Sequence, residues 1–456
     1  MHSAYSQSLI VIKFIYLYFY SKKLYFMNRK AQTSLKSDID KLIHLYRSKN
    51  FNSALKLSNS LLELNPDEPF LLNVHGIINL SLENWQNALL AFKKILKKDD
   101  KFTEAYNNLG VTYSHLGEND KAIENYKKAI ELNKDYASAY NNLATQYDDF
   151  GEYPIAMKNY AQALRCNPEH LNAQNNLIRI LNFYKTDQHE DNSIIKANNK
   201  IQEVRSKILR FNEINTSNVS RFIKECNEII KTNLNKTIFL ETQIHKRNGE
   251  NLNCDRHKKV FNKHNIIPKY CFSCFKVQIE LKEVSQLIKL FFIFNYLKLP
   301  KDNIRKCFIE LRENVNGNYK ALIYCSSVDE AKIVSELTNV YLKKFLKNFR
   351  LDIKRGCTEF DFSFPGYKDV KKINEIVYNE EWKKKEKLVD IEIANGSQKG
   401  KKIFSKSIND ITLSEVLIIN NWLTYAKIIG DESYKKISSD FIFSEHISRI
   451  TNKLKN

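Results

Sequence analysis

The sequence predicts two structural parts in a chain of 456 residues: an α-helical repeat solenoid, followed by an α+β module with further helices. Two patterns lead to this prediction. Residues 35–183 repeat themselves with a period of 34 residues, which is typical of helix-pair repeats. Residues 253–366 alternate short apolar runs with helical patterns, which indicates strands and helices in turn. With 43% hydrophobic and 27% charged residues, the composition excludes a wholly disordered chain.

The N-terminal extension, residues 1–34, contains an apolar run at residues 9–20. Its 12 residues, interrupted by Lys13, are far fewer than the ~20 that a membrane-spanning helix needs. One interpretation is a short membrane-associating anchor. The other, which we favour, is that translation starts at Met27 and that residues 1–26 are not translated. We therefore expect a cytoplasmic protein with no membrane span.

The repeats are clearest in residues 103–136 and 137–170, which carry the same residue types at the same offsets. Residues 35–68 and 69–102 are weaker copies, and residues 171–183 repeat only the first helix, as a capping helix would. The matched pairs between the two best copies are Tyr106 and Tyr140, Leu109 and Leu143, Gly110 and Ala144, Tyr113 and Tyr147, Ala122 and Ala156, Tyr126 and Tyr160, and Ala129 and Ala163.

Through these residues the stretch 35–183 resembles the tetratricopeptide repeat (TPR) family. The resemblance implies that each unit is a pair of antiparallel helices and that the units stack into a solenoid, an α-α superhelix with a concave groove. Small residues such as Gly110 are expected where helices cross closely, and Tyr126 is expected to fill gaps between helix pairs. The resemblance also implies a protein or peptide partner in the groove, and hence a scaffold that acts by protein binding.

Pairs of asparagines recur at one position of the first helix in three successive repeats. A side-chain amide offers one acceptor and two donors, so a ladder of amides can bind a peptide backbone whatever its sequence. The resemblance supports this role, since peptide-binding members of the family use an Asn at this position. The alternative is that the amides are satisfied inside the solenoid. The residues expected to bind peptide are Asn107, Asn108, Asn141, Asn142, Asn175 and Asn176.

Residues 184–252 are expected to form a linker and helices, and a Cys-rich α+β module follows in residues 253–366. Its patterning and the hairpin signal Asn316-Gly317 predict the order β-α-β-β-α-β, that of the ferredoxin-like split motif. The predicted elements are strands at residues 275–281, 305–312, 319–326 and 351–357, with helices at residues 284–297 and 327–345.

Residues 367–456 combine a Lys-rich segment with C-terminal helices. Thr412 and Glu415 have the spacing of a capping box, which predicts an apolar helix that ends at Gly430. A final helix is expected over residues 433–454.

Six of the eight cysteines lie in the α+β module. Cys254, His257, Cys271 and Cys274 have the spacing C-x2-H-x13-C-x2-C, and two ligand pairs on tight turns suit a tetrahedral metal ion. We therefore expect one structural zinc ion and no other cofactor. Buried, inert thiols and a redox-active C-x-x-C pair remain alternatives.

The sequence has only 11 glycines, and it contains no Gly-rich phosphate-binding loop, no nucleophile elbow and no H-E-x-x-H motif. An interaction scaffold is therefore favoured over an enzyme, and no catalytic residue is assigned. One alternative is a transferase-like enzyme that uses the Cys-rich module, with His257, Cys274 and Cys357 as candidate residues. The other is a zinc-stabilised nucleic-acid-binding protein.

The net charge of +20 is unevenly distributed. Residues 35–183 carry 17 basic and 18 acidic side chains, whereas residues 184–456 carry 50 and 34. The repeat groove should therefore recognise shape and backbone amides, and only the second half has a charge suited to an acidic ligand. The residues available there for RNA are Tyr319, Lys320, Tyr324, Lys354 and Arg355, although their spacing is not that of a ribonucleoprotein motif.

Overall fold

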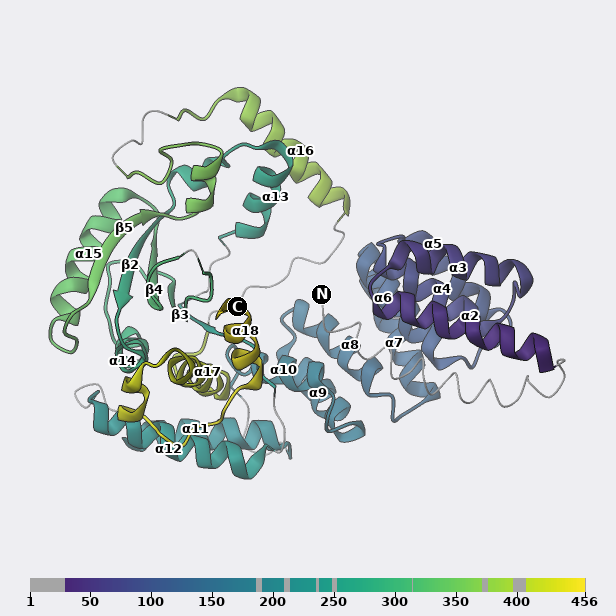
Figure 1. Cartoon of the computed structure of the whole chain (residues 1–456), viewed down its shortest axis with the longest axis horizontal. Helices are drawn as coiled ribbons and strands as arrows, with labels where there is room; N and C mark the ends of the chain where they lie inside the picture. The colour runs from purple at the N-terminus through teal and green to yellow at the C-terminus, as the bar shows by residue number, and fades with distance from the viewer. Residues whose placement is uncertain are drawn as a thin grey trace. The chain divides into compact units, whose positions relative to one another are not determined.

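The protein forms two compact units, which are described separately below (Figure 1). The repeat unit ends at Asn176, and the second unit comprises Leu177–Ile393 and Phe404–Asn456. The computed structural model describes residues 29–185, 191–208, 214–234, 238–247, 252–313, 315–370, 376–396 and 407–455.

The repeat unit is a solenoid of helices that pack as successive pairs joined by short loops. The 34-residue period of the sequence is therefore a period of two helices. The pairs are α2 (Arg29–Arg47) with α3 (Phe51–Leu64), α4 (Pro69–Ser81) with α5 (Trp85–Leu96), α6 (Thr103–Leu116) with α7 (Asn119–Leu132), and α8 (Ala137–Asp149) with α9 (Tyr153–Cys166), and α10 (Leu171–Ile180) follows them.

Glycines let the two helices of a pair approach each other closely. A Cβ atom on Gly110 in α6 would lie only 2.5 Å from the Tyr126 ring of α7. The same distance separates a Cβ atom on Gly76 in α4 from the Phe92 ring of α5. Both rings are buried, so there is no room for a side chain at either glycine. The Tyr126 ring thus packs against Gly110 of its own helix pair.

The second unit is built on an antiparallel sheet of five strands within the described residues. β2 lies in the interior of the sheet and pairs with both β4 and β5 over most of its length. In the order β1-β3-β4-β2-β5, the strands are β1 (Gln243–Lys246), β3 (Arg305–Ile309), β4 (Tyr319–Cys325), β2 (Phe275–Leu281) and β5 (Arg350–Arg355).

Helices cover one face of this sheet (Figure 1). The residues that face them, such as Val277, Cys307 and Ala321, are almost completely buried. The covering helices are α14 (Val284–Phe294), α15 (Val328–Leu342) and α17 (Leu413–Ile429). The other helices of the unit are α11 (Ser193–Ile208), α12 (Thr216–Asn233), α13 (Cys254–His264), α16 (Glu380–Gly396) and α18 (Glu445–Lys455).

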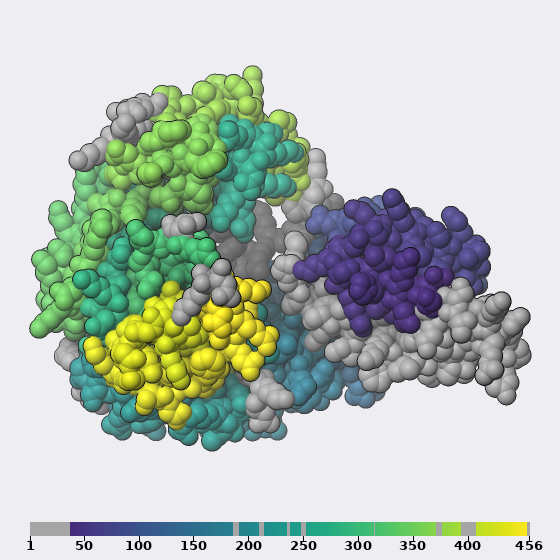
Figure 2. Space-filling view, viewed as in Figure 1, coloured from purple at the N-terminus to yellow at the C-terminus, as the bar shows by residue number. Residues whose placement is uncertain are grey.

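The α17 helix is buried over most of its length. Every residue from Leu413 to Ala426 is buried, and the expected capping box of Thr412 and Glu415 opens the helix. The Glu415 carboxylate forms a buried ion pair with Lys246 of β1 at 2.5 Å. The Trp422 indole donates a hydrogen bond to the carbonyl of Thr242 at 2.8 Å. In Figure 2 this C-terminal region, coloured yellow, lies against the teal surface of α11 and α12.

Four local features differ from the sequence-based expectation. β1 was not expected, and β3 ends at Ile309 rather than at residue 312. Cys254 and His257 lie in the helix α13 instead of on a tight turn. In place of one long final helix, a short 3-10 helix (Glu432–Lys436) precedes α18.

The close approach at Gly110 makes a prediction for stability. We expect Gly110→Leu to lower the free energy of unfolding by about 2–3 kcal/mol, because the added side chain overlaps the Tyr126 ring. Glu124→Leu, on the exposed side of α7, introduces the same residue without overlap and is the matched control. Urea unfolding of both variants measures the difference. Equal stability of the two variants would show that the helix pair is not closely packed at this point.

Candidate functional site

In the repeat unit, the asparagines of the first helices form one continuous chain of hydrogen bonds between side-chain amides. Between repeats, the second Asn of a repeat donates a hydrogen bond to the first Asn of the preceding repeat. Within a repeat, the first Asn donates a hydrogen bond to the second. Along the chain, Asn176 Nδ2 donates to Asn141 Oδ1 (3.2 Å), Asn141 to Asn142 (3.3 Å), Asn142 to Asn107 (2.9 Å), Asn107 to Asn108 (3.4 Å) and Asn108 to Asn73 (2.9 Å).

This amide chain uses only part of the hydrogen-bonding capacity of its members. Asn107 and Asn141 are buried, whereas Asn108 and Asn142 are half-buried. Each of the latter two donates one of its two amide protons along the chain. The expected peptide-binding residue Asn175 stands apart, since its Oδ1 atom is buried without a hydrogen-bond partner. The structure thus brings five of the six expected residues into one network.

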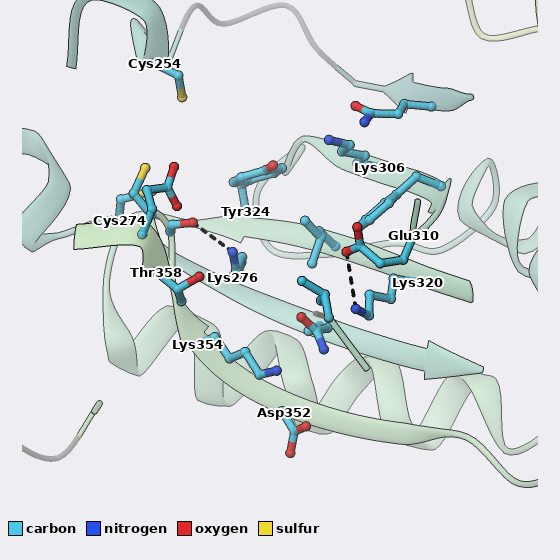
Figure 3. A pocket seen from close by; sticks show the side chains of 18 of the residues that line it. Cys254, Cys274, Lys276, Lys306, Glu310, Lys320, Tyr324, Asp352, Lys354 and Thr358 are labelled. Carbon is cyan, nitrogen blue, oxygen red and sulfur yellow. Dashed lines mark hydrogen bonds and ion pairs between the residues drawn. The ribbon is translucent and has the colours of Figure 1, made fainter. Parts of the chain in front are cut away.

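In the second unit, a cavity of about 1750 Å³ lies over the face of the sheet that α14, α15 and α17 leave uncovered (Figure 3). Alternate residues of each strand line it, because successive side chains of a strand point to opposite faces. Its walls include the start of α13, the loop from β3 to β4, and the segment that follows β5.

Besides Lys320 of β4, lysines from three other strands point into this cavity (Figure 3). Lys276 of β2 stands directly opposite Lys354 of β5 and Tyr324 of β4. Lys306 lies on β3, opposite Leu322. Lys276 donates a hydrogen bond to the carbonyl of Gly356 at 2.8 Å, and none of the three lysines forms an ion pair within the described residues.

Burial changes the proton affinity of two of these lysines. Burial, followed by repulsion from Lys276, lowers the pKa of Lys306 to about 8. Burial also lowers the pKa of Lys276, and Lys354 adds to the effect. Opposite Lys306 on β1, His245 has its pKa lowered to about 4 by burial and by the Lys306 charge, and it is therefore neutral at pH 7.

Two acidic residues at the other end of the cavity, Glu310 and Asp352, are already paired. Glu310 accepts hydrogen bonds from Arg312 at 2.8 Å and from the buried Lys320 at 3.3 Å. Although burial opposes the change, these cations hold the pKa of Glu310 below its usual value. Asp352 pairs with Arg350 at 2.9 Å.

Four cysteines gather at one end of the cavity, around the start of β2 and the end of β5. Cys254, Cys274 and Cys357 line the cavity, and Cys271 packs with Cys357 in one apolar cluster. The backbone N–H of Gly356 donates to the carbonyl of Cys274 at 2.9 Å, which sets Cys357 beside the C-x-x-C segment. The Cys271 and Cys357 thiols are hydrogen-bonded to each other, which raises the pKa of Cys271 and lowers that of Cys357.

His257, the remaining residue of the expected metal set, has different neighbours. Its ring stacks on Tyr270 with 5.3 Å between the ring centroids. Burial and the Arg256 charge lower its pKa, and Glu386 and Asp390 act in the opposite direction. In the described part of the chain, no three His, Cys, Asp or Glu side chains converge tightly enough to hold a metal ion as they stand.

Among the described helices, none has both the length and the apolar character that a bilayer crossing requires.

The residues considered for RNA contact are divided by the sheet. Tyr324 and Lys354 face the cavity, and the buried Lys320 faces it while paired with Glu310. Tyr319 lies on the opposite face, fully buried against Tyr425 of α17. Arg355 is also buried, and its guanidinium packs over the Phe275 and Tyr367 rings.

Comparison with known proteins identifies the repeats. Two models of the tetratricopeptide repeat family match residues 103–136 and 125–158. Residues 103–158 are therefore tetratricopeptide repeats. No curated protein matches the chain.

Solved structures with similarity to the chain include three repeat proteins. MamA from Desulfovibrio magneticus RS-1 is 20% identical over 34% of this chain and 85% of its own, with a TM-score of 0.29. A thermophilic TPR protein in Thermus thermophilus, TTC0263, is 17% identical over 44% and 93%, with a TM-score of 0.30. The first TPR of Spaghetti (RPAP3), bound to an HSP90 peptide, is 21% identical over 25% and 89%, with a TM-score of 0.24. At these TM-scores, none of the similarities carries a functional conclusion for this chain.

Sequence reasoning missed the lysine-lined cavity and the position of Cys357. A signal for the cavity was present, since Lys276, Lys306, Lys320 and Lys354 each stand between two apolar or aromatic residues or beside one on their strands. Cys357 lies 83 residues after Cys274 in the sequence, and only the pairing of β2 with β5 brings the two together.

The lowered pKa of Lys306 predicts unusual reactivity. Because its pKa is about 8, a large part of its amine is neutral at pH 8, and we expect it to be acetylated early by limiting acetic anhydride. Peptide mass spectrometry across pH 6–11 measures the modified fraction, and Lys306→Arg identifies the signal. Modification at Lys306 that begins only above pH 10 would contradict the burial of this amine.

Proposed function

We propose that the protein is an interaction scaffold whose repeat unit binds an extended peptide segment of a partner protein. The observation that carries this proposal is the chain of amides on the first helices of successive repeats. In solenoids of this kind, the stacked units form an extended concave binding surface. Each half-buried amide retains one N–H for a ligand, so the chain offers donors at the spacing of the repeats.

The charge of the repeat unit agrees with this mode of binding. The 17 basic and 18 acidic side chains of residues 35–183 nearly cancel, so that electrostatic attraction contributes little to partner choice. Hydrogen bonds to the peptide backbone are independent of side-chain sequence. Specificity must then come from the surfaces beside the amides, and half-buried Tyr106 and Tyr140 are the large side chains nearest to them in the sequence.

Peptide binding can be tested with the full chain and a peptide selected against it by phage display. We expect the double variant Asn108→Ala and Asn142→Ala to bind the selected peptide at least about tenfold more weakly, because two donors are removed. Asn159→Ala removes an amide that donates to the Ile155 carbonyl within its own helix, and it is the matched control. Fluorescence polarisation measures the affinity, and thermal unfolding verifies that both proteins are folded. Unchanged affinity in the folded double variant would refute the role of the amide chain.

We further propose that the second unit is a ferredoxin-like split domain extended by β1 and supported by one structural zinc ion. The order β2-α14-β3-β4-α15-β5 supports this class. For the metal, Cys254, Cys271, Cys274 and Cys357 are better placed than the set that includes His257. Tetrahedral thiolate sites are typical of structural zinc, and binding here requires side-chain rotation that brings the four sulfur atoms together. The cytoplasm remains the proposed location, a reducing compartment in which cysteines stay available to a metal ion.

Metal analysis of the purified full chain tests the zinc proposal. We expect about one zinc per chain, with loss of the metal in Cys357→Ser and retention in His257→Ala. Inductively coupled plasma mass spectrometry gives the stoichiometry. Zinc that is lost in His257→Ala but kept in Cys357→Ser would restore the ligand set expected from the sequence. Absence of metal from the wild-type chain, even after reconstitution under reducing conditions, would end the proposal.

A further inference from the structure

The cavity of the second unit places like charges opposite each other. Lys276 and Lys354 are direct cross-strand partners, an arrangement that is unfavourable for two charges of the same sign. Lys306 adds a third positive charge. Repulsion from Lys276 contributes, after burial, to lowering the pKa of Lys306. Its ammonium group lies 4.9 Å from the centre of the Phe308 ring, and no carboxylate is bound to it within the described residues.

The nearby carboxylates balance this charge only in part, since Glu359 and Glu310 attract Lys276 and Lys306 without forming an ion pair with them. Glu310 is engaged by Arg312 and Lys320, and Asp352 is engaged by Arg350. His245 across from Lys306 is neutral at pH 7. Among the described residues, the fold therefore maintains three ammonium groups in a cavity, at a cost in stability, without a protein counter-charge bound to them.

The walls of the cavity restrict the shape of the ligand. The start of α13, the loop between β3 and β4 and the segment after β5 surround the sheet face that carries the lysines. Tyr324, beside Lys276, and Phe308, beside Lys306, add aromatic surface. Such a site favours a small molecule with a concentrated negative charge and a flat or apolar part.

We propose that this cavity binds a small phosphate-bearing ligand, held by Lys276, Lys306 and Lys354. Ammonium groups are common ligands of phosphate, since they act as compact point charges with three donors each. A bound phosphate removes the repulsion between Lys276 and Lys354 and supplies the absent partner of Lys306. This proposal does not depend on peptide binding, because all its residues belong to the second unit.

Binding can be measured with pyrophosphate and AMP as probes on the full chain. Isothermal titration calorimetry and thermal unfolding are performed at constant ionic strength, with sodium sulfate as the reference anion. We expect saturable binding of at least one probe and a melting temperature that rises with its concentration. A stronger response to AMP than to pyrophosphate would identify a nucleotide-like ligand, whereas the reverse order would identify the phosphate group as the main determinant.

Matched variants separate the site from general charge effects. We expect Lys306→Met to weaken binding at least about tenfold, because it removes a charged hydrogen-bond donor. In the absence of ligand the same variant should melt at a higher temperature than the wild type, since the unpaired charge has been removed. Lys344→Met makes the same change of charge on the exposed turn that follows α15 and should affect neither quantity.

Three results would overturn the proposal. The first is that neither probe stabilises the chain more than sulfate does. The second is that Lys306→Met binds the probes as tightly as Lys344→Met. The third is that a single-stranded oligonucleotide binds far more tightly than both probes and depends on the same lysines, which would replace the small ligand by nucleic acid.

Discussion

The architecture of the second unit depends on the burial of α17. A helix that is apolar on all sides is stable in water only if other elements surround it. Here α11, α12, α14 and the sheet provide these surroundings, with buried hydrogen bonds where polar groups cannot be avoided. The Asn420 side chain, for example, donates to Asn227 of α12 at 2.8 Å. Residues almost 200 positions apart thereby belong to one core.

The position of α17 also determines where the sheet is accessible. Because α14, α15 and α17 all pack on one face, the polar residues of the strands are left to line the opposite face. The Lys246–Glu415 ion pair fixes the short strand β1 to α17 at the edge of the sheet. Burial raises the pKa of Glu415, and the Lys246 charge acts against this effect. The cavity is thus a consequence of how the core is assembled.

Much of the fold could be predicted from local sequence patterns, and the site could not. The 34-residue period, the strand and helix order from residue 275 to 355 and the capping box at Thr412 are all local signals. β1 escaped prediction because four residues, QIHK, carry no clear alternation of apolar and polar side chains. The partners of Lys276 and Cys274 depend on the register of β2 with β5, which the sequence alone does not specify. The asparagine positions followed from the repeat, but their mutual hydrogen bonds arise from the stacking of the repeats.

The amide chain of the repeat unit has a direction. Between repeats, each amide donates to an amide of the preceding repeat. Within a repeat, the first amide donates to the second. None of these five hydrogen bonds has the reverse polarity. Reversal of a single amide would place two donors or two acceptors in contact, so the whole chain adopts one orientation. A peptide backbone is itself a polar sequence of donors and acceptors. If a peptide segment lies along these amides as proposed, it meets different surroundings when its two ends are exchanged, and the two N-to-C directions are then not equivalent.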